Sequence, residues 1–424
     1  MISLYPFQTE ALQATRNDNR VAYYMDMGLG KTFVGSEKLM QLAQSINIVV
    51  CQKSKIQDWY NHFDKYYQCR IYDLTNKKQL EYFLSNPSCN VPTIGIINYD
   101  LVWRRKELLR LCGFTLMLDE SSLIQSDTAK RTKFILQMNP QNVILLSGTP
   151  TSGKYENLWS QIHLLGWNIS KELYNRQYVN WVTIDNDGFI ARVVDKDNPY
   201  KHVERLKDKL RTNGAFFKKS EECFDLPEQV FITTNVSTIP EYRRFRKNKV
   251  VTIADTELIG DTILTERLYC RMLCGHYNKH KLQAFSDLVQ STNERLIVFY
   301  NYNAELEALK AIAESLNRPI SQVNGAVKDL SAYEESGDSI TLIQYQAGAM
   351  GLNLQKANRI IYFTLTDKSE LFEQSKKRIH RIGQSQTCFY HLLICKNSVE
   401  EDILRTLEMR QDYTDELFRK RVQA

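Results

Sequence analysis

Short apolar runs alternate with longer amphipathic stretches along most of the chain. In the first 150 residues these runs are rich in β-branched residues, and polar clusters follow them directly. Such runs are typical of buried strands, and the stretches between them have helical periodicity, as residues 33–44 illustrate. We therefore expect strands that alternate with helices in a doubly wound parallel sheet. The expected strands are residues 21–25, 46–51, 93–97, 116–118 and 143–146.

The last third of the chain repeats this α/β pattern. It predicts strands at residues 295–300, 339–344 and 359–363, and a helix at 304–315. A further helix is expected to carry Gln374, Arg378 and Arg381 and to end at Gly383-Gln384. Between the two α/β regions the pattern is less regular. It indicates mainly helix at residues 155–178, a hairpin with its turn at Asp185–Gly188, and a charged helix at 201–211.

A length of 424 residues suggests two or three domains. The boundary is expected near Asp225-Leu226-Pro227, because proline ends helices and stiffens linkers. We expect an N-terminal domain at residues 1–220, with a helical and hairpin insertion at about 151–215. The C-terminal domain then covers residues 221–424, with a helical insertion at about 240–290.

Composition indicates a soluble globular protein. Apolar residues make up 43% of the chain and charged residues 25%, and no stretch has the length of a transmembrane helix. The first residues lack the pattern of a secretory signal, so we expect a cytoplasmic protein with no membrane association. Nine scattered cysteines fit reduced thiols. The net charge of +6 permits nucleic-acid binding but fits a solvated surface equally well.

The strongest chemical signal is the glycine-rich segment Met27-Gly28-Leu29-Gly30-Lys31-Thr32. It lies between an expected strand and an expected helix, where unpartnered amides and the helix dipole favour a phosphate. Gly28 and Gly30 allow the backbone to approach a phosphate closely, Lys31 can reach the β- and γ-phosphates, and Thr32 can bind magnesium. Met25 stands where the strict pattern has a further glycine.

Two charged pairs fit phosphate chemistry as well. Asp119-Glu120 follows an expected strand, where Asp119 can hold magnesium and Glu120 can deprotonate the attacking water. Arg378 and Arg381 are three residues apart and would share a helix face. Arginine is permanently charged and binds phosphate in a fork, so the pair suits an anion held by another domain.

Four possible zinc ligands, Cys270, Cys274, His276 and His280, lie within eleven residues. Zinc sites of this composition normally separate the cysteine pair from the histidine pair by about a dozen residues. Buried cysteines on a helix are therefore the better interpretation.

Taken together, these motifs make the sequence similar to superfamily 2 helicase-type motors, specifically the Swi/Snf-type ATPases. Arg378-Ile379-His380-Arg381-Ile382-Gly383-Gln384 resembles the family's Arg-Ala-His-Arg-Ile-Gly-Gln. Leu146–Pro150 and Gly348–Leu354 resemble its third and fifth motifs, and the resemblance covers residues 4 to about 404 in the family's motif order. It implies two RecA-like doubly wound parallel-sheet lobes with helical insertions, ATP and Mg²⁺ as cofactors, and double-stranded or branched DNA as the partner.

The resemblance also implies roles for individual residues. Gln8 would read adenine. The phosphates and magnesium would be bound by Gly28, Leu29, Gly30, Lys31 and Thr32. Asp119 would bind the metal, and Glu120 would activate the attacking water. Arg378 and Arg381 would be the arginine fingers, and Gly351 would line the nucleotide. The DNA-contacting residues would be Lys53, Ser54, Asn98, Ser147, Thr149, Asn301 and Gly348, of which Ser147 and Thr149 would couple nucleotide to DNA.

The acidic motif reads Asp-Glu-Ser-Ser, where many relatives have His at the position of Ser122, so the coupling between the lobes differs in detail. No appended module fits in the remaining length, and we expect a minimal, monomeric motor of bacterial or phage type. Two other functions stay open. One is a strand-separating or branch-migrating helicase, with the hairpin around Asp185–Gly188 as its wedge. The other is a non-catalytic clamp, gated by nucleotide, that binds DNA or a protein.

Overall fold

The computed structural model describes residues 3–85, 91–186, 189–348 and 352–418. The chain divides into two compact units, Met1–Cys223 with Asp412–Ala424, and Phe224–Gln411. The last described residues thus belong to the first unit, whereas the sequence analysis expected the second domain to run to the C-terminus. Across these described ranges, no helix is both long and apolar enough to cross a membrane.

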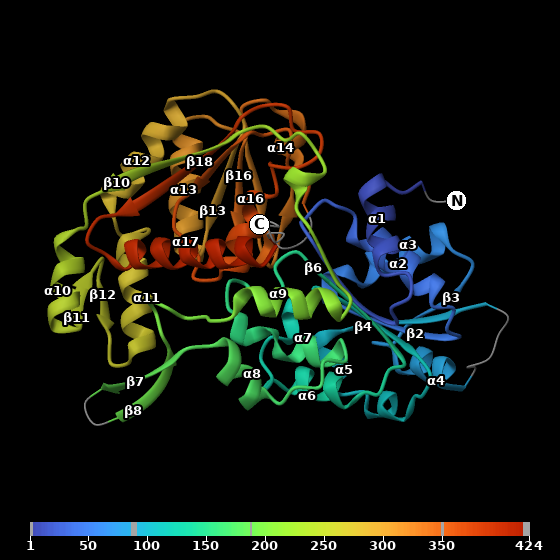
Figure 1. The fold of residues 1–424 in the computed structure, drawn as a ribbon. Coiled ribbons are helices and arrows are strands. Elements are labelled where there is room, and N and C mark those ends of the chain that lie inside the picture. The colour runs from blue at the N-terminus through green and yellow to red at the C-terminus, as the bar shows by residue number, and fades with distance from the viewer. Residues whose placement is uncertain (1–2, 86–90, 187–188, 349–351, 419–424) are drawn as a thin grey trace. The chain divides into compact units, whose positions relative to one another are not determined.

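The first unit is built on a seven-stranded, fully parallel sheet of order β3-β4-β2-β5-β6-β1-β9 (Figure 1). Its inner strands are buried along nearly their whole length, which explains their continuous apolar runs. The strands in chain order are β1 (Arg20–Met25), β2 (Ile46–Cys51), β3 (Arg70–Asp73), β4 (Thr93–Asn98), β5 (Thr115–Asp119), β6 (Asn142–Ser147) and β9 (Ala215–Lys218).

Helices cover this sheet and fill the segment after β6. Val34 of α2 and Trp59 of α3 are buried over one face, and Phe134 of α6 and Leu206 of α9 belong to the core on the other. The α-helices are α1 (Pro6–Ala14), α2 (Lys31–Gln41), α3 (Ile56–Tyr66), α4 (Lys77–Ser85), α5 (Tyr99–Val102), α6 (Lys130–Gln137), α7 (Trp159–Leu164), α8 (Lys171–Tyr178) and α9 (Val203–Thr212). Short 3₁₀ turns are η1 (Lys53–Lys55), η2 (Lys106–Arg110), η3 (Ser121–Ile124), η4 (Tyr155–Leu158) and η5 (Ser220–Glu222).

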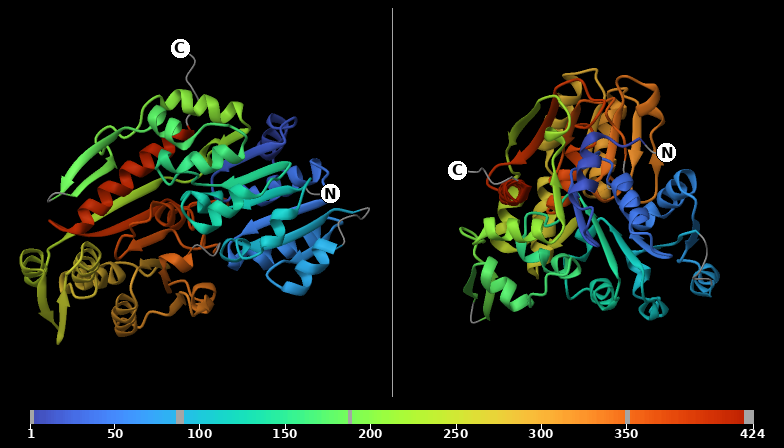
Figure 2. Two further views of the ribbon diagram at one scale, coloured as in Figure 1. Left: turned by 90° about the horizontal axis from the view of Figure 1, so that it is seen from below. Right: turned by 45° about the vertical axis from the view of Figure 1, so that its right-hand side comes forward.

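The expected hairpin is present as β7 (Trp181–Asn186) and β8 (Phe189–Val194), which pair antiparallel. It projects away from the sheet of the first unit (Figures 1 and 2). Two turn residues, 187 and 188, lie outside the described residues. Ile190 of this hairpin is 71% exposed.

The second unit has its own seven-stranded sheet of order β10-β18-β17-β13-β16-β14-β15. All neighbouring strands are parallel except β14 and β15. The strands are β10 (Gln229–Val236), β13 (Leu296–Tyr300), β14 (Ile320–Val323), β15 (Lys328–Asp329), β16 (Ile340–Gln344), β17 (Arg359–Tyr362) and β18 (Cys388–Cys395). The fold class predicted from the sequence, two doubly wound α/β lobes, is confirmed.

Helices cover both faces of the second sheet. Alternate residues of β13 belong to two separate cores, one formed with α12 and α13 and the other with α16 and α17. A small hairpin, β11 (Val250–Ile253) and β12 (Thr256–Ile259), lies between α10 and α11 in the chain. The α-helices are α10 (Pro240–Asn248), α11 (Ile263–Cys274), α12 (Lys279–Gln290), α13 (Asn303–Ser315), α14 (Ser331–Glu335), α15 (Tyr345–Gly348), α16 (Ser369–Lys376) and α17 (Val399–Phe418).

The end of α17 is fixed to the first unit. Leu417 and Phe418 are buried in its core, and the ring of Tyr413 packs edge-to-face against that of Tyr200. The Asp415 carboxylate lies 2.5 Å from Lys219 Nζ. These contacts explain why the division of the chain assigns the C-terminal residues to the first unit.

Candidate nucleotide-binding site

The glycine-rich segment, the acidic pair and the Ser147–Pro150 loop meet at the carboxyl edge of the first sheet. β1 pairs with β6 and β6 with β5, so these three segments leave neighbouring strands. The register aligns Tyr24 with Ser147 and Leu146 with Asp119, which puts all three loops at one level. Ligands of parallel α/β sheets bind at this edge. The polar clusters that follow these three strands therefore lie at one edge of the sheet.

The glycine-rich loop has the backbone geometry of a phosphate cradle. Gly28 and Gly30 have φ angles of 86° and 71°, in the left-handed region that glycine adopts without strain. Gly30 is the N-cap of α2, so the first-turn amides of a helix of 11 residues follow it directly. Lys31 Nζ donates to the carbonyls of Met25 and Asp26, at 2.8 and 3.2 Å. A bound phosphate can replace these two carbonyls.

Gln8 supports the same loop from α1. Its Nε2 donates to the Leu29 carbonyl at 3.0 Å, and its Oε1 accepts from the Tyr5 amide at 2.9 Å. The side chain is buried and lies against the Cα of Gly30, where any Cβ would collide with it. In this structure Gln8 therefore braces the loop, and both ends of its amide are engaged within the protein.

The Asp119 carboxylate is oriented by Trp59. The indole Nε1 of Trp59, on α3, donates to Asp119 Oδ2 at 2.8 Å. Trp59 is buried and stacks on Phe63, so its ring has little freedom. Burial raises the pKa of Asp119, while the indole hydrogen bond and the nearby Lys31 charge act in the opposite direction. Sequence analysis did not identify Trp59, because no sequence pattern links it to a carboxylate sixty residues later.

Glu120 has a strained backbone. Its φ and ψ angles are 55° and 61°, in the left-handed region, which costs a non-glycine residue about 1–2 kcal/mol. Such strain persists only where the surrounding structure enforces it. Here the conformation turns the chain sharply between β5 and η3, directly after the metal-binding candidate Asp119.

The residues present fit a magnesium nucleotide. The Thr32 hydroxyl belongs to the first turn of α2, and Asp119 supplies a carboxylate at the end of β5. Oxygen ligands of this kind suit Mg²⁺. A Cβ added to Gly148 would lie 3.5 Å from Lys31 Nζ, so the Ser147–Pro150 loop lies close to the lysine.

The residues expected to contact DNA differ in their exposure. Lys53 and Ser54, in η1 after β2, are exposed. Asn98 and Ser147 are buried, and Ser147 Oγ accepts from the Thr149 amide at 3.1 Å. Thr149 is also buried, with 7% exposure. Gly348 ends α15.

In the second unit, Arg381 is partly exposed and its guanidinium is bonded to Asn353 Oδ1. Burial lowers the pKa of Arg381 from its ordinary value, but the group stays charged at neutral pH. Arg378 is buried, and its backbone carbonyl accepts from the Leu354 amide at 3.1 Å. Asn353 belongs to the Gly348–Leu354 segment that resembles the fifth motif, but its contact with Arg381 could not be predicted, since only the fold brings the two residues together.

The prediction that Arg378 and Arg381 share one helix face is wrong. Helix α16 ends at Lys376, and the following residues form a turn in which the Arg378 amide bonds to the Ser375 carbonyl. His380 fixes this turn, because its Nε2 lies 2.9 Å from the carbonyl of Pro227. The side-chain Nε2 of Gln384 donates to the backbone carbonyls of Gln355 and Ala357.

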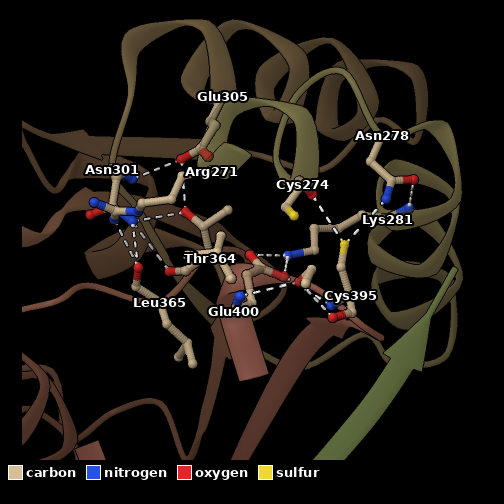
Figure 3. Close-up of polar contacts among 12 residues, drawn as sticks. Arg271, Cys274, Asn278, Lys281, Asn301, Glu305, Thr364, Leu365, Cys395 and Glu400 are labelled. Carbon is tan, nitrogen blue, oxygen red and sulfur yellow. Dashed lines mark hydrogen bonds and ion pairs between the residues drawn. The ribbon is translucent and has the colours of Figure 1, made fainter. Parts of the chain in front are cut away.

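Two further predicted residues have different outcomes. Gly351 lies outside the described residues. Asn301 donates through Nδ2 to Thr364 Oγ1 at 2.9 Å and to the Leu365 carbonyl at 3.2 Å, and Glu305 completes this buried network (Figure 3). The Asn301 side chain thus connects β13 to the segment after β17.

The four possible zinc ligands, Cys270, Cys274, His276 and His280, are not gathered into a metal-binding cluster in the described part of the chain. Cys270 and Cys274 lie on α11 and are buried, as the preferred interpretation expected. Among the described residues, Cys274, Cys395 and Glu400 make the one group whose potential ligand atoms lie within 4.8 Å of one another. Lys281 Nζ already contacts both oxygens of Glu400, at 2.5 and 2.6 Å, so an ammonium group stands beside the position that a metal would need.

Comparison with known proteins gives two family matches. Residues 24–276 match the SNF2-related domain, and residues 280–383 match the helicase conserved C-terminal domain. A solved structure described as the Sulfolobus solfataricus SWI2/SNF2 ATPase core in complex with dsDNA has 18% sequence identity and a TM-score of 0.44. The alignment covers 98% of this chain and 92% of that one.

Two curated relatives illustrate the range of similar sequences. A putative ATP-dependent helicase/translocase YwqA of Bacillus subtilis is 24% identical over 349 residues, covering 74% of this chain and 36% of the relative. The ISWI chromatin-remodeling complex ATPase ISW1 of Saccharomyces cerevisiae is 20% identical over 465 residues, covering 96% and 40%. The chain therefore spans well under half the length of these two relatives.

Proposed function

The chain belongs to the SNF2-related domain family, and from this premise we propose that it is a DNA-dependent ATPase that couples hydrolysis to movement along, or remodelling of, double-stranded DNA. One observation carries the proposal. Lys31, the Asp119-Glu120 pair and the Ser147–Pro150 loop lie together at the carboxyl edge of one parallel sheet. These are the groups that phosphoryl transfer needs in one place.

We assign each group a step. The amides after Gly30 and the Lys31 ammonium hold the phosphates, and Thr32 and Asp119 would hold Mg²⁺, which neutralises phosphate charge when it is bound. Glu120 accepts a proton from the attacking water. Arg378 and Arg381 stabilise the charge that develops on the transferred phosphoryl group. Gln8 would read adenine only if its amide exchanged the Leu29 carbonyl for the base.

DNA binding is assigned first to Lys53 and Ser54. Their exposure at the end of β2 supports this choice over the buried Asn98 and Ser147. Contacts to phosphates are sequence-independent and weaken as salt rises. We expect Lys53→Ala to reduce the salt dependence of DNA binding by about one counterion.

The decisive experiment is phosphate release by the purified full chain, measured without nucleic acid and with single-stranded, duplex or branched DNA or RNA. We expect duplex DNA to stimulate turnover most, and Lys31→Ala and Glu120→Gln to abolish it. Equal stimulation by RNA and duplex DNA would contradict the assigned substrate. No turnover under any condition would favour a nucleotide-gated clamp that binds without hydrolysis.

A strand-separating or branch-migrating helicase is the second candidate, and the projecting β7–β8 hairpin supports it. Displacement of a strand from forked or four-way DNA distinguishes it from duplex translocation, which instead displaces the third strand of a triplex. Shortening the hairpin should abolish only the first activity if it acts as a wedge.

A further inference from the structure

A single buried glutamine, Gln161 of α7, connects β1 to the segment after Asp119-Glu120 and to the Ser147–Pro150 loop. Its Oε1 accepts from the Ser121 hydroxyl at 2.8 Å and from the Tyr24 hydroxyl at 3.1 Å. Its Nε2 donates to the Pro150 carbonyl at 2.7 Å. The side chain has no solvent exposure, so these bonds have no competition from bulk water.

Each partner of Gln161 stands next to a group with an assigned role. Tyr24 precedes Met25, whose carbonyl accepts from Lys31 Nζ. Ser121 follows the strained Glu120. Pro150 follows Thr149 at the end of the Ser147–Pro150 loop. The amide thus contacts β1 beside the carbonyl that holds Lys31, the residue after Glu120, and the last residue of the Ser147–Pro150 loop.

A second amide supports the Pro150 end of this arrangement. Gln125 Nε2 donates to the same Pro150 carbonyl at 3.3 Å and to Ser152 Oγ at 3.1 Å. Asn157 Nδ2 in turn donates to Gln125 Oε1 at 3.2 Å. The Pro150 carbonyl therefore accepts from two glutamines, one from α7 and one after η3. A displacement of this loop would change both contacts.

We infer that Gln161 is a positioning residue of the ATPase reaction, which sets the Glu120–Ser121 segment against the Thr149–Pro150 loop. A displacement of the loop then reaches the Glu120 carboxylate through one side chain. The inference rests on the proposed function, in which Glu120 activates water.

The test compares Gln161→Leu with Asn142→Leu. Leucine has a similar size but forms no hydrogen bonds. Asn142 is a matched control, because it is a buried amide at the opposite end of β6 that donates to Thr115 Oγ1 at 3.2 Å. We measure kcat and KM for ATP with duplex DNA, the binding of a fluorescent ADP analogue, and the folded fraction by urea unfolding.

For Gln161→Leu we expect kcat to fall about 10- to 100-fold, a typical cost of misplacing a catalytic group, with KM and ADP binding within about threefold. Asn142→Leu should lower stability by a comparable amount and leave kcat per folded molecule unchanged. Ser121→Ala should give a smaller loss, and the double variant with Gln161→Leu should be no worse than Gln161→Leu alone, because both remove the same connection.

Equal kcat for the two leucine variants, or additive losses in the double variant, would show that Gln161 only stabilises the core. If Gln161→Leu does not fold, Tyr24→Phe and Ser121→Ala carry the test. Each removes one bond to Oε1, and a larger kcat loss for Ser121→Ala supports the inference, whereas equal losses overturn it. A wild-type chain without DNA-stimulated turnover overturns the proposed function itself, which separates the two failures.

Discussion

The two units each hold a buried polar centre, and the two centres differ in charge. In the first unit the neutral amide of Gln161 joins three segments through uncharged hydrogen bonds. In the second unit the Lys281 ammonium meets both oxygens of Glu400 (Figure 3). The side chains of this ion pair are 0% and 2% exposed.

The second centre connects four elements of the scaffold. Glu400, in the first turn of α17, accepts from the Cys395 amide at the end of β18. Asn278, the N-cap of α12, donates to Cys395 Sγ at 3.2 Å, and this sulfur contacts the Cys274 carbonyl at the end of α11. Burial is the largest single influence and lowers the pKa of Lys281, but the Glu400 charge and hydrogen bond, together with Cys395 and Cys274, raise it, and the net shift is upward.

The two centres respond differently to movement. A neutral hydrogen bond contributes about 1 kcal/mol net, so the bonds of Gln161 can break and re-form as segments move. Separating a buried ion pair leaves an uncompensated charge and costs several kcal/mol. The Gln161 centre is therefore suited to couple segments that move. The Lys281–Glu400 pair instead holds α11, α12, β18 and α17 in one fixed arrangement, which we call the frame. Substitutions in the catalytic groups and in the frame should then affect different measurements.

Arg381→Ala should have the largest effect and should spare the frame. Arginines that stabilise a transferring phosphoryl group contribute about 10³–10⁵ in rate, so we expect DNA-stimulated hydrolysis to fall at least 10³-fold. Nucleotide binding and urea unfolding should change little, because the guanidinium is partly exposed and its described contact is with Asn353. Phosphate release and fluorescent-nucleotide titration measure the two properties separately.

The matched control is Arg405→Ala on α17, where the side chain is 74% exposed. It should leave hydrolysis unchanged. A fall of less than tenfold in Arg381→Ala would remove this residue from the reaction and leave Arg378 as the remaining candidate.

Lys281→Met should lower the stability of the second unit, whereas Arg381→Ala should lower the rate of hydrolysis. It leaves the Glu400 charge buried without its partner, and we expect a loss of about 3–5 kcal/mol in the free energy of unfolding of the second unit. Replacing both residues, as in Lys281→Met with Glu400→Leu, should recover most of this loss. Urea unfolding followed by circular dichroism measures both changes.

An exposed ion pair supplies the control. Lys356 and Glu334 have side chains that are 51% and 53% exposed, so Lys356→Met should cost less than about 1 kcal/mol. Equal losses for Lys281→Met and Lys356→Met would mean that the buried pair does not fix the frame.

A histidine buried in the first unit predicts a particular pH dependence. His62 is buried among aromatic rings, with Nε2 2.9 Å from Ser36 Oγ, and burial lowers its pKa from 6.5 to about 4. Between pH 6.5 and 4 the unfolded chain therefore binds a proton that the folded chain does not. Stability should fall as pH decreases through this window, by about 3 kcal/mol from His62 alone.

Unfolding of wild type and His62→Gln from pH 7 to 4 isolates this contribution. The wild type should lose about 3 kcal/mol more over that range than the variant does. His163→Gln, at an exposed histidine of α7, is the control and should follow the wild type. Parallel curves for wild type and His62→Gln would show that the folded state accommodates the charged ring.

The sequence predicted most of the strands that are buried on both faces, but not β18. The run at 46–51 became β2 with the same bounds, because a continuous β-branched run has few other stable environments. It did not predict β10, whose residues are half exposed, or the short edge strand β3. The carboxyl-edge cluster was predictable because parallel strands end at one side of a sheet.

The supporting contacts of the site could not be predicted. Trp59 reaches Asp119 across sixty residues, and Gln161 reaches Pro150 only because α7 packs against the loop. Neither relation leaves a periodic signal in the chain. The helix predicted through Arg381 failed for a related reason, since a bond between His380 and Pro227 stabilises a turn that local periodicity does not encode.

Trp59→Phe should have the smallest effect of these substitutions. It shows whether a hydrogen bond within the first unit orients the charged Asp119 carboxylate. It removes the indole hydrogen bond to Asp119 but keeps an aromatic ring against Phe63. A hydrogen bond to a charged group contributes about 1.5–3 kcal/mol, part of which water can replace, so we expect half-maximal Mg²⁺ to rise about tenfold. The free energy of unfolding should fall by about 1 kcal/mol.

The measurement is Mg²⁺ titration of fluorescent ADP binding, together with urea unfolding without nucleotide. Trp159→Phe is the matched control, because that indole donates to the Ile169 carbonyl at 2.9 Å in the same unit and contacts no assigned group. Both variants lose one indole hydrogen bond, so their stabilities should fall alike while only Trp59→Phe changes the Mg²⁺ midpoint. Identical midpoints would reduce Trp59 to a core residue, and the orientation of Asp119 would then depend on the backbone of β5 alone.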